Sequence, residues 1–432
     1  MAFIEPKTGA LARIRVVGIG GGGQNAVTSM IESNAVDGVE FVAMNTDLQA
    51  LNTSPAQIRV QLGPERTHGL GSGGDPNTGY EAAKESLDEV KAHLQGSDMV
   101  FIAAGMGGGT GTGAAPIIAQ IAKEIGALTV GVVTKPFLFE GKKRMNQGEL
   151  GIREMKEKVD ALIVIPNERL LEIVDSNVSL KEAFAVADEV IGKAVEGISD
   201  LINSTGLVNV DFADVKAVME NAGSALMGIG QADGENRAEK AANAAVRSPL
   251  LDVDIKGSTG ILINVVGDSS MTMHEVNTAS KIVSDAAHDA ANIIFGANVD
   301  PNVEGIRVTV IATGFDSDYK SRMQDLPSFD DREVLDQIDA RFDNDAENQS
   351  DDVSGSSRRN ETDLSDDEEF DIEAMREKVA KMEEDENGSS DGDDDSDFDE
   401  KNDKDESDDD GEKESRGNEL GGSFFDFLKG RR

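Results

Sequence analysis

The stretch "GMGGGTGTGAAP", residues 105–116, holds six glycines and two threonines in twelve positions. It follows the apolar run "DMVFIAA" and precedes "IIAQIAKEIG", so it predicts a strand, a glycine loop and a helix. Glycine lets backbone N–H groups approach a ligand closely, and a helix start adds unpaired N–H groups and a positive dipole end. The stretch therefore predicts an anion site, most often for phosphate, with a flexible loop or tight turn as the alternative.

A second glycine run, "GIGGGGQNAV" at residues 18–27, has the same position between a strand and a helix. Its glycines fit G-x-G-x-x-G, with an acid downstream at Glu40 or Asp47, which is the dinucleotide fingerprint but is weak alone. A P-loop is excluded, because no Gly-Lys pair is followed by Ser or Thr. Two glycine-rich helix starts on one sheet suit a triphosphate, and the turn "GLGSGGDP" at residues 69–76 could cover its last phosphate.

Composition narrows the class of protein. The chain has 432 residues and no Cys, so disulfides, thiolate metal sites and Cys nucleophiles are excluded. Its four His are scattered without metal-ligand spacing, and no apolar run reaches the length of a membrane span. Net charge is −42, of which residues 316–432, with 43 acidic and 16 basic side chains, carry −27. We expect a cytoplasmic protein without direct contacts to nucleic acid or membrane.

The order of apolar and helical segments predicts an α/β fold. Strands are expected at 13–20, 39–47, 99–105, 127–136 and 161–166, with helices at 25–32, 78–94, 116–126 and 142–159. This alternation indicates a parallel, Rossmann-like sheet covered on both faces. A long helix follows from Ser179, which forms a capping box with Glu182. Beyond it, helices at 211–220, 236–248 and 272–290 and strands at 223–230, 260–268 and 306–315 predict a second, smaller α/β unit.

The last part of the chain has a different composition. From about Asp316 it consists largely of Asp, Glu, Ser, Asn and Gly, which cannot bury enough apolar surface to fold. Within it, Ile372, Met375, Val379 and Met382 share one helical face. The end, "SFFDFLKGRR", groups apolar residues at helical spacing and predicts a partner-binding peptide, with a frayed terminus as the alternative. Its partner-binding residues are expected to be Phe424, Phe425, Phe427 and Leu428.

A series of motifs resembles one known family. "GGGGQNAV", "NTD", "GLGSGGDPNTG", "GGGTGTGAAP", "KPFLFEGKKR", "IPNERL", "AFAVADEV" and "NVDFADV" occur in this order between about residues 10 and 315. The series is similar to the FtsZ family of bacterial-type cell-division GTPases, within the tubulin superfamily. The resemblance implies six regions: a flexible N-terminus (1–12), a GTP-binding domain (13–178), a central helix (179–203), a C-terminal α/β domain (204–316), a disordered acidic linker (317–422) and the terminal peptide (423–432).

The resemblance also implies a site. The residues expected to hold GTP or GDP are Gly20, Gly21, Gly22, Asn25, Asn45, Gly71, Gly73, Gly74, Gly107, Gly108, Gly109, Thr110, Gly111, Thr112, Gly113, Pro136, Glu140, Arg144, Asn167, Phe184 and Asp188. The family stacks the matching Phe on guanine and uses the matching Asp to accept its N1–H and 2-amino donors. Mg²⁺ and a monovalent cation are further candidate ligands, and no metal site formed by side chains is expected. Taken from the residues alone, Glu140 and Arg144 are equally well a surface ion pair. For Phe184 and Asp188 the residues alone favour a core side chain and an exposed one, and only the resemblance reverses this.

"NVDFADV" supplies the catalytic residues that the resemblance implies: Asn209, Asp211 and Asp214, acting on the GTP of the next subunit. The simpler interpretation is that Asp211 caps a helix whose first turn contains Asp214. The implied function is GTP-dependent assembly of head-to-tail filaments into a ring at mid-cell, with membrane-tethering division proteins bound to the terminal peptide. The alternatives are an NAD(P)-dependent oxidoreductase and a non-hydrolysing scaffold. Two departures from the family pattern are His68, where Arg is expected, and the absence of Pro before the terminal apolar pair.

Overall fold

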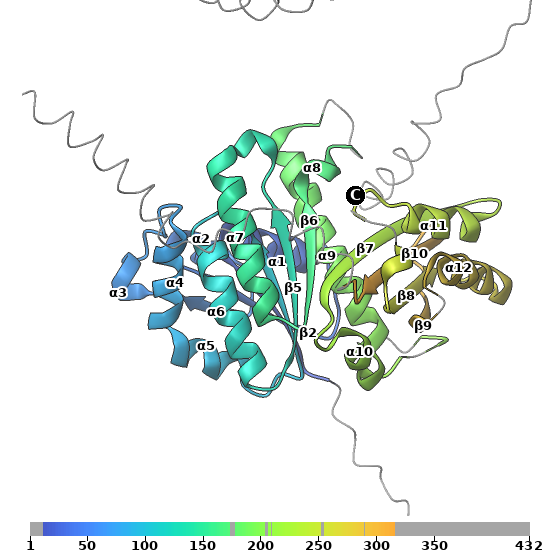
Figure 1. Ribbon diagram of the computed structural model, residues 1–432, viewed down its shortest axis with the longest axis horizontal. Helices are drawn as coiled ribbons and strands as arrows, with labels where there is room; N and C mark the ends of the chain where they lie inside the picture. The colour runs from blue at the N-terminus through green and yellow to red at the C-terminus, as the bar shows by residue number, and fades with distance from the viewer. Residues whose placement is uncertain are drawn as a thin grey trace, which may run out of the picture. The chain divides into compact units, whose positions relative to one another are not determined.

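The computed structural model describes residues 12–172, 178–203, 206–208, 210–251, 255–288 and 290–315. Ten strands in this part form one sheet in the order β3-β2-β1-β4-β5-β6-β7-β10-β8-β9 (Figure 1). The strands are β1 (Ile14–Ile19), β2 (Val39–Asn45), β3 (Ile58–Gln61), β4 (Met99–Gly105), β5 (Leu128–Lys135), β6 (Ala161–Pro166), β7 (Gly223–Ala232), β8 (Gly260–Gly267), β9 (Asn292–Val299) and β10 (Ile306–Thr313).

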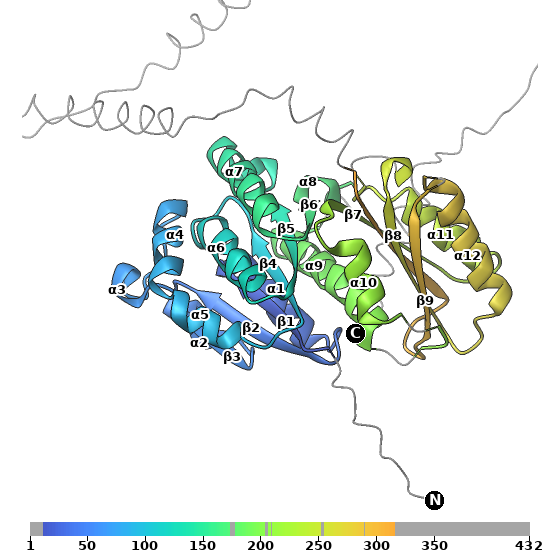
Figure 2. The same ribbon diagram turned by 60° about the horizontal axis from the view of Figure 1, so that its bottom comes forward.

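Helices cover both faces of this sheet, as the alternating pattern predicts. They are α1 (Gly20–Glu32), α2 (Leu48–Thr53), α3 (Pro64–Thr67), α4 (Pro76–Glu85), α5 (Leu87–Leu94), α6 (Thr110–Glu124), α7 (Lys142–Lys158), α8 (Asn167–Leu170), α9 (Leu180–Asn203), α10 (Phe212–Met219), α11 (Arg237–Val246) and α12 (Met273–Ala286). Apolar residues of α1, α9 and α10 form one core layer that runs under both halves of the sheet. On the other face, α4 to α7 pack on the N-terminal strands, and α11 and α12, side by side in Figure 2, pack on the C-terminal strands.

The first six strands are parallel and have the doubly wound order that places ligands at their carboxyl ends. The sheet then continues without a break, because β6 pairs in parallel with β7. β10 is antiparallel to both of its neighbours, β7 and β8. The predicted α/β fold with a mostly parallel sheet is therefore confirmed, and one sheet runs through both predicted α/β units.

Several elements differ from the expected ones. The helix expected at 78–94 is two helices, which meet at Ser86, whose hydroxyl accepts a hydrogen bond from Gly63 N at 3.0 Å. The first helix starts at Gly20, within the glycine run, rather than at Asn25. The last one ends at Ala286 rather than near residue 290. The strands β3 and β9 were not expected, since β3 has only four residues and β9 is a half-exposed edge strand.

Candidate functional site

The two long glycine loops lie side by side because their strands are neighbours. β1 pairs in parallel with β4, so the loops that follow Ile19 and Gly105 leave the same edge of the sheet. Gly20 begins α1 with a φ of +68°, and a Cβ there would lie 2.9 Å from the backbone N of Gly111. A Cβ at Gly22 would lie 3.2 Å from the Gly105 Cα. The two backbones touch, which only glycine allows at these positions.

Four glycines from three loops each have open space beside their Cα atom, and we call this set the glycine cradle: Gly21, Gly73, Gly74 and Gly108. A Cβ at any of them would meet no atom within 4 Å apart from its chain neighbours. Gly73 and Gly74 also have positive φ angles, of +64° and +78°, which side chains rarely adopt. Because α1 and α6 both start beside these glycines, their dipoles and unpaired N–H groups favour an anion there.

Four other glycines of the 105–116 stretch serve packing. A Cβ would collide with a neighbouring element at four positions: Gly107, Gly109, Gly111 and Gly113. At Gly107, for example, it would lie 2.6 Å from both the Pro136 Cγ and the Arg144 carbonyl oxygen. At Gly113 it would overlap the carbonyl oxygen of Pro76, at the start of α4. These glycines let α4 and α7 pack directly against the loop and the start of α6.

The two threonines of the stretch are buried and hold the loops together. The Thr110 hydroxyl lies 2.7 Å from the Thr46 hydroxyl and 3.1 Å from that of Ser72. The Thr112 hydroxyl accepts a hydrogen bond from Gly107 N at 2.9 Å, which closes the loop on itself. Thr46 and Ser72 were missing from the predicted site, although each adjoins a predicted residue in "NTD" or "GSGG".

The end of β2 is anchored to α1 by buried amides. The Asn45 side chain donates to Gln24 Oε1 at 3.1 Å and accepts from Asp47 N at 3.2 Å. Gln24 in turn donates to the Ala50 carbonyl oxygen at 2.6 Å. Asn45 is 3% exposed, and both the oxygen and the nitrogen of its side-chain amide are hydrogen-bonded. Asn25, beside Gln24, is exposed.

The segment after β5 places a carboxylate and a guanidinium next to the loops. Glu140 accepts a hydrogen bond from Phe137 N at 3.0 Å, and its other oxygen pairs with Arg144, four residues later. The surface ion pair considered from spacing alone is therefore present. The Arg144 side chain is 52% exposed and that of Glu140 only 12%, so the guanidinium is the more accessible partner. Pro136 is buried against the glycine loop.

Two predicted site residues lie at the carboxyl ends of β5 and β6, Phe184 and Asn167. Phe184, on the second turn of α9, is 38% exposed, and its ring packs in T-shaped geometry against Phe137 and Phe139 at centroid distances of 5.3 and 6.3 Å. Asn167 starts α8 directly after β6 and is 5% exposed. Its Oδ1 is buried without a hydrogen-bond partner among the described residues. An unpaired buried acceptor is costly, so this position suits a ligand that brings a donor.

Asp188 adds a second acceptor one helical turn after Phe184. Burial raises the pKa of its carboxyl from 3.8 to about 7, and no hydrogen bond or charge within the described residues offsets this. The side chain is half-buried, neither in the core nor fully exposed. A ligand with two adjacent N–H donors would satisfy the carboxylate and favour its ionised form.

The predicted catalytic aspartates lie elsewhere. Asp211 caps α10, accepting from Asp214 N at 2.9 Å, as the simpler interpretation predicts, and both side chains are exposed. The chain on either side is tied to the amino ends of the parallel strands. Before it, Asn203 donates to the carbonyl oxygens of Asp37 and Gly38 at 3.3 Å, just ahead of β2. After it, Asn221 N donates to the Asp160 carboxylate at 3.4 Å, just ahead of β6.

The helix α9 thus runs from the carboxyl ends of the parallel strands to their amino ends. Phe184, near its start, lies at the carboxyl edge with the glycine loops, and Asn203, its last residue, lies at the amino edge. In Figure 1, α8 and α10 mark these two ends, at the top and bottom. Its 24 residues correspond to roughly 36 Å at 1.5 Å per residue. Within one chain, the structure does not bring Asp211 and Asp214 to the glycine loops.

Several expectations fall outside the described residues. They concern Asn209, the N-terminal segment, the linker and the terminal peptide with Phe424, Phe425, Phe427 and Leu428. His68 is described: it is exposed and ends α3 with a φ of +51°. Over the described ranges, no group of three or more His, Asp and Glu could hold a metal ion. The same ranges contain no helix long and apolar enough to cross a membrane.

The fold and the site together define an α/β protein of the doubly wound class, with glycine loops at the carboxyl ends of its parallel strands. Residues 13–175 match the Tubulin/FtsZ family GTPase domain, and residues 223–316 match the FtsZ family C-terminal domain. FtsZ from M. jannaschii, solved as an empty dimer, is 51% identical with a TM-score of 0.68, over 71% of this chain and 89% of that one. Its W319Y mutant is also 51% identical, with a TM-score of 0.68, over 70% and 91%.

A more distant structure shares the fold alone. CetZ2 from Haloferax volcanii, solved as a GTPγS-bound protofilament, is 20% identical with a TM-score of 0.61, over 76% of this chain and 99% of that one. The chain belongs to the FtsZ family, as the motif series predicts. It is a GTPase whose function is GTP-dependent filament formation in cell division.

Proposed function

We propose that GTP lies across the carboxyl edge of the N-terminal strands, with its phosphates in the glycine cradle and its base beside α9. Two acceptors without partners support this position, the Asn167 Oδ1 and the Asp188 carboxyl. Guanine carries adjacent N1–H and 2-amino donors, whereas adenine lacks this pair. The Phe184 ring packs in T-shaped geometry against Phe137 and Phe139, and its exposed part remains for the base. Mg²⁺ bound with the triphosphate would neutralise charge on its oxygens, with a monovalent ion as a further candidate.

Hydrolysis is proposed to occur between subunits. The observation that carries this proposal is that Asp211 and Asp214 lie at the end of α9 opposite the glycine loops. GTP hydrolysis depends on positioning a water and stabilising charge. A carboxylate that cannot reach its own nucleotide can act only on that of a neighbouring copy in a head-to-tail filament. We assign Asn209 to the same group, as the resemblance implies.

In the cell, we propose that the filaments form a cytoplasmic ring at mid-cell. Residues 13–178 would bind GTP, and residues 204–316, joined to them by the helix 179–203, would offer Asp211 to the next subunit. The acidic linker 317–422 would act as an extended tether, since like charges repel along it. The terminal peptide 423–432 would bind membrane-tethering division proteins.

Mixing two inactive variants tests hydrolysis in trans. Asp211→Ala should bind GTP, form filaments and lose most phosphate release. Gly108→Ser places a side chain in the glycine cradle, where no protein atom obstructs it, so it should fold but not bind GTP. Its own Asp211 remains able to serve another chain. Phosphate release measured against mixing ratio, at constant total protein, should therefore rise above both pure variants.

A matched substitution separates catalysis from helix capping. Asn caps a helix as well as Asp does, so Asp211→Asn keeps the bond to Asp214 N but loses the carboxylate. If Asp211→Asn retains wild-type turnover, Asp211 is only a cap. If no mixture recovers activity although sedimentation shows co-assembly, hydrolysis in trans is wrong.

A further inference from the structure

A buried group of charges joins α9 to the C-terminal strands. Glu196, on α9, is 5% exposed, and Arg307, on β10, is 6% exposed. The Arg307 Nη2 lies 2.7 Å from Glu196 Oε1, and the Lys193 Nζ lies 2.8 Å from Glu196 Oε2. Both carboxylate oxygens are thus paired, one with a cation from the same helix and one with a cation 111 residues later in the chain. Breaking such a pair on one side is costly, because it leaves a buried charge unpaired.

Asp200 lies one turn beyond Glu196 and faces the same layer. Burial is the main cause that raises its pKa from 3.8 to about 7. The Glu196 and Asp300 carboxylates raise it further, while Arg307 and Lys193 oppose the shift. These four groups come from α9, from β10 and from the turn after β9. No hydrogen bond to the Asp200 carboxyl forms within the described residues.

Beside Asp200 there is a small pocket that is partly open to solvent. Its polar side chains are Asp200, Asn264 and Asn298, and the rest of its lining is Leu201, Gly206, Val208, Gly296 and Ala297. The segment 206–208 pairs with the edge strand β9 through Val208 and Ala297. The carboxyl therefore lies where the central helix, the C-terminal strands and the chain leading to α10 meet. Because the pocket is partly open to solvent, water can reach the ionised group.

We propose that Asp200, Glu196 and Arg307 form a proton-sensitive latch that holds the last turns of α9 against β10. With Asp200 protonated, Glu196 is the one buried negative charge on this part of the helix, and Arg307 holds it. With Asp200 ionised, two carboxylates one turn apart repel each other, and the second draws water into the junction. The latch is then loosened at the end of α9 that precedes Asp211. The latch itself does not rest on the proposed function. Only an effect of the latch on GTP turnover would rest on it.

The pH dependence of stability tests the latch in the full-length protein without nucleotide. Because the pKa of Asp200 is higher in the folded state than in the unfolded one, the folded state binds more protons, and stability falls as pH rises toward 7. Between pH 5 and 6.5, each pH unit should raise the unfolding equilibrium constant of the wild type about tenfold relative to that of Asp200→Asn. Asp188 titrates in the same range, so Asp188→Asn and the double variant separate the two contributions. Asp285→Asn, at an exposed carboxyl on α12, is the matched control.

Hydrogen exchange locates the effect. After correction for intrinsic rates, amides of residues 195–203 and 306–313 should lose protection between pH 6 and pH 8 in the wild type but not in Asp200→Asn. In Glu196→Gln the carboxylate that Arg307 holds is absent, so both segments should already be less protected than in the wild type at pH 6. Equal pH slopes for wild type and Asp200→Asn, or a loss of protection elsewhere only, would overturn the latch.

Discussion

At the residue scale, two side chains at the proposed nucleotide site have polar atoms without a partner in the described residues. Asn167 keeps a buried acceptor without a partner, and Asp188 keeps a carboxyl whose pKa is raised by burial alone. Elsewhere in the site, polar groups are paired within the protein: Thr110 with Thr46, and Asn45 with Gln24. This contrast separates residues that hold the loops together from residues that remain available to a base.

Asp188 should set both base specificity and its pH dependence. Asp188→Ala should weaken GTP binding by about 1–3 kcal/mol, because two guanine donors lose their acceptor. In the wild type, GTP affinity should fall as pH drops below about 7, since a protonated carboxyl cannot accept both donors. The measurement is GTP and ATP binding at pH 6, 7 and 8. Asp188→Asn controls for titration of the nucleotide itself and should lack this additional loss. Equal affinities of the wild type for GTP and ATP would contradict the assignment.

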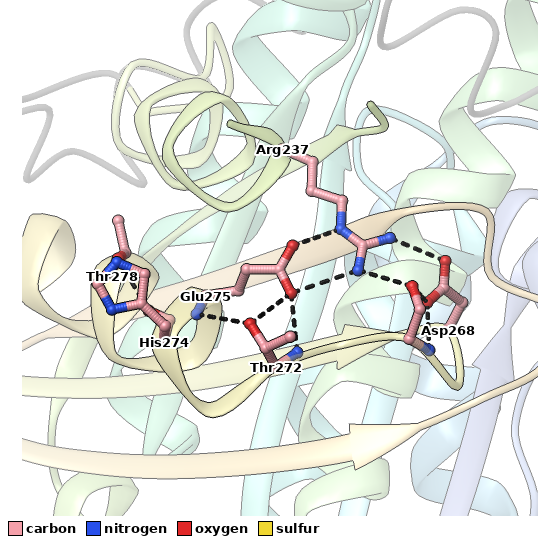
Figure 3. Close-up of polar contacts among 7 residues, drawn as sticks. Arg237, Asp268, Thr272, His274, Glu275 and Thr278 are labelled. Carbon is pink, nitrogen blue, oxygen red and sulfur yellow. Dashed lines mark hydrogen bonds and ion pairs between the residues drawn. The ribbon is translucent and has the colours of Figure 1, made fainter. Parts of the chain in front are cut away.

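At the element scale, the guanidinium of Arg237 joins α11 to α12 and to the loop after β8. We call this junction the corner. Figure 3 shows Arg237, the first residue of α11, between two carboxylates of the β8–α12 region. Its Nε lies 2.6 Å from Glu275 Oε1, its Nη1 lies 2.9 Å from Asp268 Oδ2, and Nη2 donates to the Ser270 hydroxyl at 2.9 Å. Glu275 also forms the capping box of α12 with Thr272. One side chain thus ties the starts of two helices to the loop after β8.

Replacing this guanidinium should destabilise the corner. Hydrogen bonds from Arg237 are the main cause that lowers the pKa of Glu275 from 4.5 to about 2. A depressed pKa contributes stability above 4.5 that is lost as pH falls toward 2. Arg237→Gln should therefore lower the free energy of unfolding by about 1–3 kcal/mol at pH 7, and by less at pH 3.

Denaturant unfolding at the two pH values measures this difference. Arg247→Gln, at an exposed arginine just after the same helix, is the control and should change little. An equal loss at pH 7 and pH 3 would show that Arg237 acts through packing of its stem rather than through Glu275.

At the scale of the whole molecule, charge and apolar surface are divided along the chain. Residues 316–432 carry −27 of the total charge of −42, and their last ten include four apolar and three basic side chains. The described part holds the complete sheet and both core layers. This division favours a folded GTPase with a separate binding peptide at the end of a charged tether.

Deleting residues 423–432 tests this division. Polymerisation, followed by light scattering with GTP, and phosphate release should stay at wild-type levels, because the site and the sheet lie before residue 316. In cells, the truncated protein should lose its recruitment to the membrane. Normal rings formed by the truncated protein would contradict the role of the peptide.

The sequence by itself determined the features that depend on neighbours along the chain. Strand–glycine–helix order, the capping boxes at Ser179 and the cap at Asp211 follow from local hydrogen bonds and periodicity, and the motif series identified the family. Short or half-exposed strands such as β3 and β9 were missed because they have little apolar periodicity.

Only the tertiary structure decided which residues meet across long stretches of chain. It distinguished Gly108, which borders open space, from Gly113, which packs against Pro76. It paired Glu196 with Arg307 inside the protein and continued one sheet from β6 to β7. The physical reason is that burial, pKa and close backbone approach depend on distances set by the packing of whole elements. Local sequence patterns specify those elements but not the distances between them.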